Sequence, residues 1–243
     1  MIRDAYDRAA NIIAARGHVP EDFAVALQVE NLRLTWRPSS VRVVMLAESH
    51  VWTSEAETES RVQQPDGTET AFARFVYCLG YGERSLVAPT VLPNAGTSQY
   101  WRLFHDAVHG PETSRAEIQS RNPTTRAFAK LQLLKALKLA GIWLVDASVI
   151  ALYPNKGLSR NDYKNILRAC WDAHVREVVA GCSASAIMIV GKGVNEAIGD
   201  LVKQAAPQAE VAVVNQPNAR LSSNEIWEDR LKVFDLCRRH LSN

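Results

Sequence analysis

The sequence predicts an α/β fold of three layers, α/β/α, with helices on both faces of a central, mostly parallel four-stranded sheet. Four short apolar runs carry this prediction, because helical pattern separates each run from the next. An apolar run without alternation is typical of a strand buried on both faces, as in a parallel sheet. The predicted strands cover residues 41–46, 142–146, 186–190 and 210–214.

Helical periodicity predicts the elements between these strands. A first helix covers residues 3–16 and ends at Gly17, and a second, short helix begins at Pro20. We interpret residues 1–40 as an N-terminal helical extension of one domain that covers residues 1–243. Further helices are predicted at 70–79, 100–108, 125–140, 161–180, 194–205 and 225–241. Polar segments without periodicity predict loops at 47–70, 86–98 and 110–122.

Composition limits the class of protein. Hydrophobic residues make up 47% of the 243 residues and charged residues 22%, which excludes a disordered or collagen-like chain. The formal net charge is +2, so the whole molecule does not require an anionic partner, although a local basic groove remains open. No apolar run approaches 18 residues, and the charged N-terminus lacks a signal peptide, so we expect no membrane association.

The four cysteines are spread along the chain, and no two are closer than 12 residues. This spacing excludes a C-x-x-C pair for zinc or redox chemistry. Cysteines in apolar surroundings are mostly buried small hydrophobic residues. We therefore expect reduced thiols, a cytoplasmic protein, and no metal, iron–sulfur cluster or other cofactor.

Ligands of open parallel sheets bind outside the carboxyl ends of the strands. Glu48, Ser49 and His50 follow the first predicted strand directly. A carboxylate and an imidazole in this place can position or activate a water molecule, which is general-base chemistry. The alternative is a capped loop whose polar groups satisfy nearby backbone.

Two further strand ends carry polar or glycine residues. Asp146 ends the second strand, where it would either accept hydrogen bonds from a ligand or cap a turn. The third strand leads into Gly191-Lys192-Gly193, which lacks the spacing of a phosphate-binding loop, so we interpret it as a tight strand-to-helix turn.

The loop after the fourth strand is rich in polar side chains. Gln216 and Asn218 offer amides to a base or a phosphate, and Arg220 could pair with a phosphate. Leu221 is an apolar residue in this polar loop. The alternative is an ordinary surface turn with one leucine tucked inward. Aromatic residues that could stack on a base stand between the first two strands, at Tyr77, Tyr81, Tyr100 and Trp101, and the core is our preferred place for Trp101.

In their order, these segments resemble the motifs of the uracil-DNA glycosylase superfamily. The residues Ala47-Glu48-Ser49-His50 are similar to the first motif, which reads G-Q-D-P-Y, G-E-A-P-G or G-x-N-P-G in different branches. The segment around Asn94, Leu-Pro-Asn-Ala-Gly-Thr-Ser-Gln-Tyr-Trp-Arg-Leu-Phe, resembles N-P-G-N-R-F-W-R-L-L of the mismatch-specific branch.

Two motifs follow later in the chain. Gly-Ile-Trp-Leu-Val-Asp resembles G-x-x-L-x-N, and Asp146 takes the place of the asparagine that reads uracil. Gln-Pro-Asn-Ala-Arg-Leu-Ser resembles H-P-S-P-L-S or N-P-S-G-L-S, with one extra residue. Gln216 takes the His/Asn position, and Leu221 takes that of the leucine that enters the duplex.

The resemblance implies a uracil-DNA-glycosylase-like fold and a DNA-repair enzyme, acting as a monomer, that flips uracil or a related damaged base from DNA and hydrolyses its N-glycosidic bond. Glu48 or His50 would orient the water, with Ser49 as a further hydrogen-bonding group. Gln216 would donate to the carbonyl oxygen of the leaving base. The residues implied in binding the substrate are Ala47, Tyr77, Asn94, Asp146 and Asn218, and those implied in binding DNA are Lys192, Arg220 and Leu221.

Two other classes of function remain open. The first alternative is a catalytically inactive protein with this fold that still binds nucleic acid. The altered first and last motifs favour this alternative. An unrelated α/β hydrolase or nucleotide-binding protein is disfavoured, because the chain has neither G-x-S-x-G nor a phosphate-binding loop.

Overall fold

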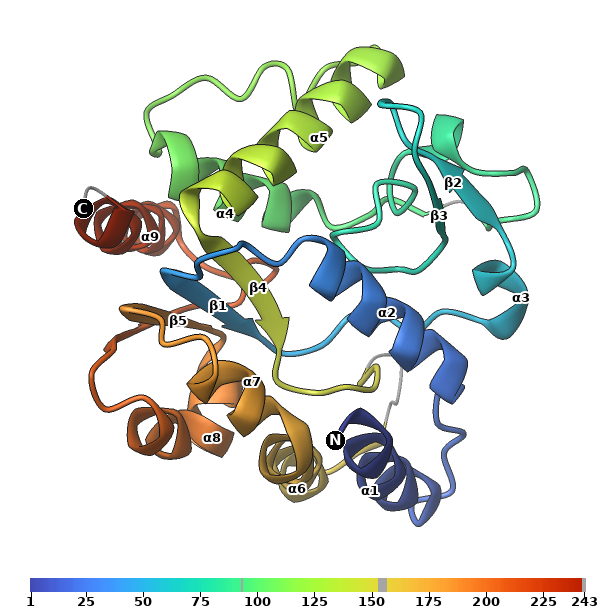
Figure 1. Ribbon diagram of the computed structural model, residues 1–243, viewed down its shortest axis with the longest axis vertical. Coiled ribbons are helices and arrows are strands. Elements are labelled where there is room, and N and C mark those ends of the chain that lie inside the picture. The colour runs from blue at the N-terminus through green and yellow to red at the C-terminus, as the bar shows by residue number, and fades with distance from the viewer. Residues whose placement is uncertain (93, 153–156, 242–243) are drawn as a thin grey trace.

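A sheet of four parallel strands crosses the middle of the molecule between two layers of helices (Figure 1). The computed structural model describes residues 1–92, 94–152 and 157–241. The predicted α/β/α fold is confirmed. The strands are β1 (Val43–Ala47), β4 (Ile142–Asp146), β5 (Ala186–Val190) and β6 (Glu210–Val214), in the order β4-β1-β5-β6 across the sheet.

Burial explains why the apolar runs form the centre of this sheet. Every residue of β1 and β5, and of the edge strand β4, is buried, whereas β6 at the other edge exposes Glu210. In the parallel register, Leu46 of β1 lies beside Val145 of β4 and Ile189 of β5. Parallel neighbours need long crossover connections, and the helices between the strands provide them.

The helices form two groups, one on each face of the sheet (Figure 1). One layer contains α4 (Ser98–His109), α5 (Pro123–Ala140) and α9 (Ser223–Leu241). The other contains α1 (Ile2–Ala14), α6 (Arg160–Cys170), α7 (Arg176–Ala180) and α8 (Lys192–Ala205). A π-helical turn, η2 (Trp171–Val175), joins α6 to α7, so the helix predicted over 161–180 has one irregular turn.

The N-terminal segment belongs to the core, which corrects its interpretation as an extension. Ala5 and Ile13 of α1 lie in the same hydrophobic cluster as the strands, and so do Val29 and Leu32 of α2 (Phe23–Thr35). One apolar face of each helix is therefore buried against the rest of the fold.

The helix predicted at 70–79 is absent, and the polar segment before it is not a simple loop. The chain there forms α3 (Glu55–Thr58), the antiparallel hairpin of β2 (Arg61–Gln63) and β3 (Glu69–Ala71), and the 3-10 turn η1 (Arg84–Leu86).

Local hydrogen bonding explains this difference. Gly67, at φ +84°, turns the hairpin, and Asp66 accepts a hydrogen bond from the backbone N–H of Thr68. Beyond the hairpin, the backbone of Arg74 bonds to Val51 and to the Thr53 hydroxyl instead of to a helical turn. These long-range bonds satisfy the buried backbone that a helix would otherwise satisfy.

Among the described residues, no helix has the length and apolar character needed to cross a membrane.

Truncation of the central strand tests how far the fold depends on this sheet. Leu46→Ala removes a side chain that is 0% exposed, and we expect it to lower the free energy of unfolding by about 3–5 kcal/mol. Leu139→Ala makes the same chemical change at a position that is 91% exposed, and we expect an effect within about 0.5 kcal/mol. Urea titration of both variants measures the difference. Equal effects would contradict the burial of β1.

Candidate active site at the carboxyl ends of the strands

The loops after β1, β5 and β6 meet at one end of the sheet. The chain passes from β1 to β4 on one side and then to β5 on the other, so the order of the strands reverses between β1 and β5. A crevice at such a reversal is the usual ligand site of open parallel sheets. Glu48 follows β1 at this point, Gly191 follows β5, and Gln216 lies just beyond β6.

Glu48 is held by two neutral hydrogen-bond donors. Tyr163 of α6 donates its hydroxyl to Glu48 Oε2 at 3.0 Å, and the side chain of Gln216 also hydrogen-bonds the carboxylate. Burial raises the pKa of Glu48, and these two hydrogen bonds offset only part of the rise. A carboxylate with a raised pKa is a better proton acceptor near neutral pH than an exposed one.

Of the two glycines after β5, Gly191 permits the turn of the backbone and Gly193 leaves room for Tyr163. Gly191 has φ +115°, which favours glycine, and a Cβ there would lie 3.6 Å from Gln216 Oε1. A Cβ at Gly193 would lie 3.2 Å from the Tyr163 hydroxyl. The Gly191-Lys192-Gly193 turn therefore lets the side chains around Glu48 approach closely.

Ser49 ties two loops together. Its hydroxyl accepts a hydrogen bond from the backbone N–H of Leu152 at 3.3 Å, in the loop after β4. Ala47, which the sequence suggested for substrate binding, is buried, and its carbonyl accepts the N–H of Ala147 at 2.7 Å. Both residues hold the ends of β1 and β4 in place.

His50 is buried among carboxylates, which corrects the expectation that it orients the water. Its Nε2 lies 2.6 Å from Glu21 Oε2, and its Nδ1 lies 3.6 Å from Asp146 Oδ2. Burial alone lowers the pKa of His50, but the charge of Glu21 and the contacts with Asp146 outweigh it and raise the pKa to about 9. A protonated imidazole cannot accept a proton at neutral pH, so His50 is a positioning residue.

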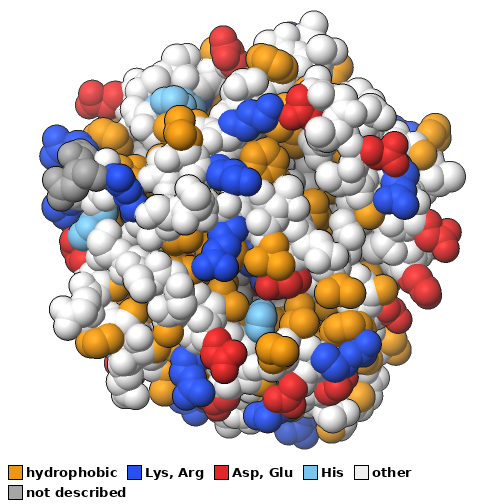
Figure 2. Space-filling model, viewed as in Figure 1, with side chains coloured by type: hydrophobic (Ala, Val, Ile, Leu, Met, Phe, Trp, Pro, Cys, Tyr) orange, Lys and Arg blue, Asp and Glu red, His pale blue; other side chains and the backbone are white. Residues whose placement is uncertain are grey.

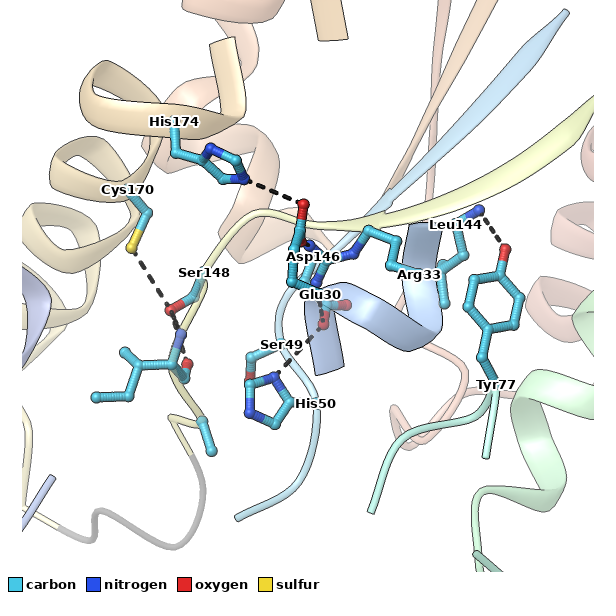
Figure 3. Close-up of polar contacts among 12 residues, drawn as sticks. Glu30, Arg33, Ser49, His50, Tyr77, Leu144, Asp146, Ser148, Cys170 and His174 are labelled. Carbon is cyan, nitrogen blue, oxygen red and sulfur yellow. Dashed lines mark hydrogen bonds and ion pairs between the residues drawn. The ribbon is translucent and has the colours of Figure 1, made fainter. Parts of the chain in front are cut away.

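Asp146 also faces the guanidinium of Arg33, which comes from α2 (Figure 3). Arg33 Nη2 lies 3.3 Å from Asp146 Oδ2, and Arg33 Nη1 pairs with Glu30. His174 Nε2 lies 3.4 Å from the other oxygen of Glu30. Both side chains of the Arg33–Asp146 pair are 2% exposed, so each charge depends on its partner inside the protein.

Glu21 completes this buried charge cluster, which we define as Glu21, Glu30, Arg33, His50, Asp146 and His174. Besides His50, Glu21 accepts the backbone N–H groups of Thr53 at 2.9 Å and Ala151 at 3.2 Å. The cluster thus connects the segment before α2 to the loops after β1 and β4. Sequence reasoning missed Glu21, Glu30 and Arg33. The available signal was the pair of charges three residues apart within the largely apolar α2.

A narrow hollow with a volume of about 20 Å³ opens beside Asp146. Its walls include Ser49, His50, Phe75, Tyr81, Tyr100 and Asp146. The ring of Phe75 meets that of His50 edge to face, with centroids 6.5 Å apart. Phe75, Tyr81 and Tyr100 are therefore the aromatic residues that a small planar ligand would meet here. Phe75 was not among the residues predicted from the sequence.

Tyr77 lies behind this wall, which corrects its assignment to substrate binding. Its ring is buried and stacks on Phe104, with centroids 6.1 Å apart, and its hydroxyl accepts the backbone N–H of Leu144 at 2.7 Å (Figure 3). Tyr77 is a core residue that supports β4. Asn94 also lies away from the hollow, and its amide donates to the carbonyl of Leu92 at 3.2 Å.

Gln216 lines a second small hollow, of about 30 Å³, between α4, α9 and the turn after β6. Leu221 contributes to the same wall and is half-buried. Lys192, Asn218 and Arg220 are exposed on the neighbouring turns. The structure thus brings Gln216 to Glu48 but places Gln216 and Asp146 in the walls of separate hollows.

Two parts of the segments singled out in the sequence lie outside the described residues. They are Pro93, in the motif around Asn94, and residues 153–156, in the loop after β4.

The fold and the site define an open parallel α/β protein with a half-buried carboxylate, Glu48, at the point where the strand order reverses. Comparisons of the chain with protein-family models, curated proteins and solved structures find no match. The resemblance to the uracil-DNA glycosylase superfamily therefore stays a prediction, and the geometry of the site is the basis for a functional proposal.

Removal of Arg33 tests the buried charge cluster. Arg33→Met leaves Glu30 and Asp146 without their cation in the interior, and we expect it to lower the free energy of unfolding by about 3–5 kcal/mol. Arg8→Met breaks the exposed pair with Asp4, for which we expect at most about 1 kcal/mol. Chemical denaturation compares the variants. A small effect at Arg33 would show that the cluster does not hold the fold together.

The raised pKa of His50 predicts a pH dependence of stability. The folded protein keeps a proton on His50 up to about pH 9, whereas the unfolded chain releases it near pH 6.5. The stabilisation is therefore full below pH 6.5 and is lost as the pH rises through 9. We expect the free energy of unfolding to fall by on the order of 3 kcal/mol over this window.

His50→Gln removes the titrating group, so its stability should fall much less between pH 6.5 and 9. His109→Gln, at an exposed histidine, should keep the pH dependence of the unmodified protein. Urea titrations at several pH values measure all three proteins. A fall that is the same in His50→Gln as in the unmodified protein would assign the dependence to other groups.

Proposed function

We propose that the protein is a DNA N-glycosylase that hydrolyses the N-glycosidic bond of uracil or a related damaged base, leaving an abasic site. The observation that carries the proposal is Glu48, a half-buried carboxylate with a raised pKa. It is oriented by Tyr163 and Gln216 at the strand reversal, the place where such folds bind ligands. The proposed form is a cytoplasmic monomer that acts on DNA without a cofactor.

The proposed reaction begins with base flipping, because the glycosidic bond of a stacked base is out of reach. Glu48 takes a proton from a water molecule as the water oxygen bonds to C1′ of the sugar. The bond between C1′ and the base nitrogen breaks, and its electron pair leaves with the base. A positioned general base typically contributes about 10²–10⁴-fold to such a step.

The hollow beside Asp146 is the proposed place for the flipped base. Phe75 and Tyr100 offer aromatic surfaces for stacking, and the Asp146 carboxylate can accept hydrogen bonds from N–H groups of the base edge. The carboxylate repels a carbonyl oxygen, unlike an amide, so the preferred base is open between uracil and related lesions. The hollow is narrow, and its side chains must part before a base can enter.

Gln216 acts in this proposal through Glu48. Its side-chain amide is engaged with the carboxylate, so its first role is to orient the proton acceptor. Donation to a developing charge on the leaving base requires Gln216 to exchange this partner. Either role makes the side chain important for the chemical step.

An excision assay tests the proposal directly. The protein is incubated with end-labelled single- and double-stranded oligonucleotides that carry uracil, hypoxanthine or a mismatched base, and alkali then cleaves any abasic sites. We expect cleavage at one class of base. If no substrate is cleaved, the glycosylase proposal is wrong, and DNA binding without cleavage would favour the inactive binding protein.

Glu48→Gln tests the assigned residue, because it keeps the size of the side chain and removes the proton acceptor. We expect single-turnover excision to slow by about 10²–10⁴-fold while DNA binding is kept. Glu59→Gln makes the same change at an exposed glutamate and should excise at the unmodified rate. Equal rates for Glu48→Gln and the unmodified protein would place the chemistry elsewhere.

A further inference from the structure

Arg102 of α4 lies between two neighbouring hollows. It contributes to the wall of the small hollow, of about 30 Å³, that Gln216 also lines. It also lines a larger cleft of about 500 Å³ between α4, α5 and nearby loops, together with Arg115. Gln216 also hydrogen-bonds Glu48, so the hollow that Arg102 and Gln216 share adjoins the candidate active site.

The larger cleft is strongly basic. Four cationic side chains line it: Arg102, Arg115, Arg126 and Lys130. No acidic residue is among its lining residues in the described chain. Glu83, which is fully buried, pairs with Arg126 at 2.8 Å and with Lys130 at 2.5 Å. Arg126 and Lys130 therefore share one carboxylate, which offsets only one of the four positive charges.

The other two charges have no carboxylate of their own. The negative charge of Asp106 stabilises the positive charge of Arg115. Asp106 itself is bound by Arg230 of α9, with N–O distances of 2.7 and 3.0 Å. Within residues 1–92, 94–152 and 157–241, no carboxylate lies within ion-pair distance of Arg102 or Arg115. The cleft thus holds an excess of positive charge, although the whole chain is nearly neutral.

The positive side chains in the cleft repel one another, and this repulsion destabilises the folded protein. Burial and the neighbouring charges of Arg230 and Arg102 lower the pKa of Arg115, and Asp106 compensates only in part. Both Arg102 and Arg115 are half-buried, so water screens them less than it would on an open surface. An anion bound in the cleft would remove the repulsion.

We propose that Arg102 and Arg115 form a phosphate subsite that binds the backbone of a DNA strand beside Glu48. Guanidinium groups match the geometry of phosphate oxygens with paired hydrogen bonds. The face shown in Figure 2 carries both basic and acidic side chains, as expected for a chain that is nearly neutral. The choice of DNA as the polyanion rests on the proposed function.

The salt dependence of binding tests this subsite. Binding of a fluorescent, undamaged duplex to the full chain is measured by anisotropy between about 50 and 200 mM KCl. The double variant Arg102→Gln/Arg115→Gln should bind more weakly at low salt. The slope of log affinity against log salt should become shallower by about 0.9 for each phosphate that is no longer neutralised, so by about 1.8 in all.

Each single variant, Arg102→Gln or Arg115→Gln, should give about half of this change, which keeps the test valid if the double variant folds poorly. The control Arg176→Gln/Lys203→Gln removes two exposed charges from α7 and α8, in the opposite helix layer. It should leave the slope unchanged. An equal change in the control would assign the effect to overall charge and overturn the subsite.

The excision assay separates this inference from the proposed function. If the unmodified protein binds DNA through both arginines but excises no base, the subsite proposal holds and the glycosylase proposal is wrong. If the unmodified protein excises a base and the arginine variants keep the slope of log affinity against log salt, the glycosylase proposal is supported and the subsite proposal is wrong. Absence of DNA binding by the unmodified protein at low salt also overturns it.

Discussion

The pair formed by Arg33 and Asp146 is the interaction on which the site depends most. Isolated charges are very costly in a protein interior, so Asp146 can end β4 inside the core only where cations face it. Arg33 and His50 supply those cations from α2 and from the loop after β1. Burial of one carboxylate therefore fixes the positions of three segments that are far apart in the sequence.

The same constraint gives the two site carboxylates different chemistry. Asp146 faces a guanidinium and a protonated imidazole, which balance its charge and hold it in place. Glu48 faces the neutral groups of Tyr163 and Gln216, and its pKa is raised. Environments that differ in this way suit one carboxylate for binding and the other for accepting a proton.

The sequence is sufficient to predict the strands and the strand-end residues, because continuous apolar runs and their alternation with helices are local signals. The hairpin at 61–71 escapes prediction although Pro65-Asp66-Gly67 is a turn sequence, because the polarity of the segment favours a loop. The positions of Tyr77 and Phe75 could not be predicted. Which aromatic ring faces a hollow depends on a buried, non-helical segment whose backbone bonds to distant residues.

The roles of the three residues after β1 follow from how each is bonded. Ser49 is engaged with the backbone of Leu152, and His50 is protonated between Glu21 and Asp146. Neither can take a proton from water at neutral pH. Glu48 alone of the three combines a raised pKa with neutral partners that leave its charge uncompensated. If this end of the sheet performs hydrolysis, the activation of water therefore falls to Glu48, which Tyr163 and Gln216 hold in place.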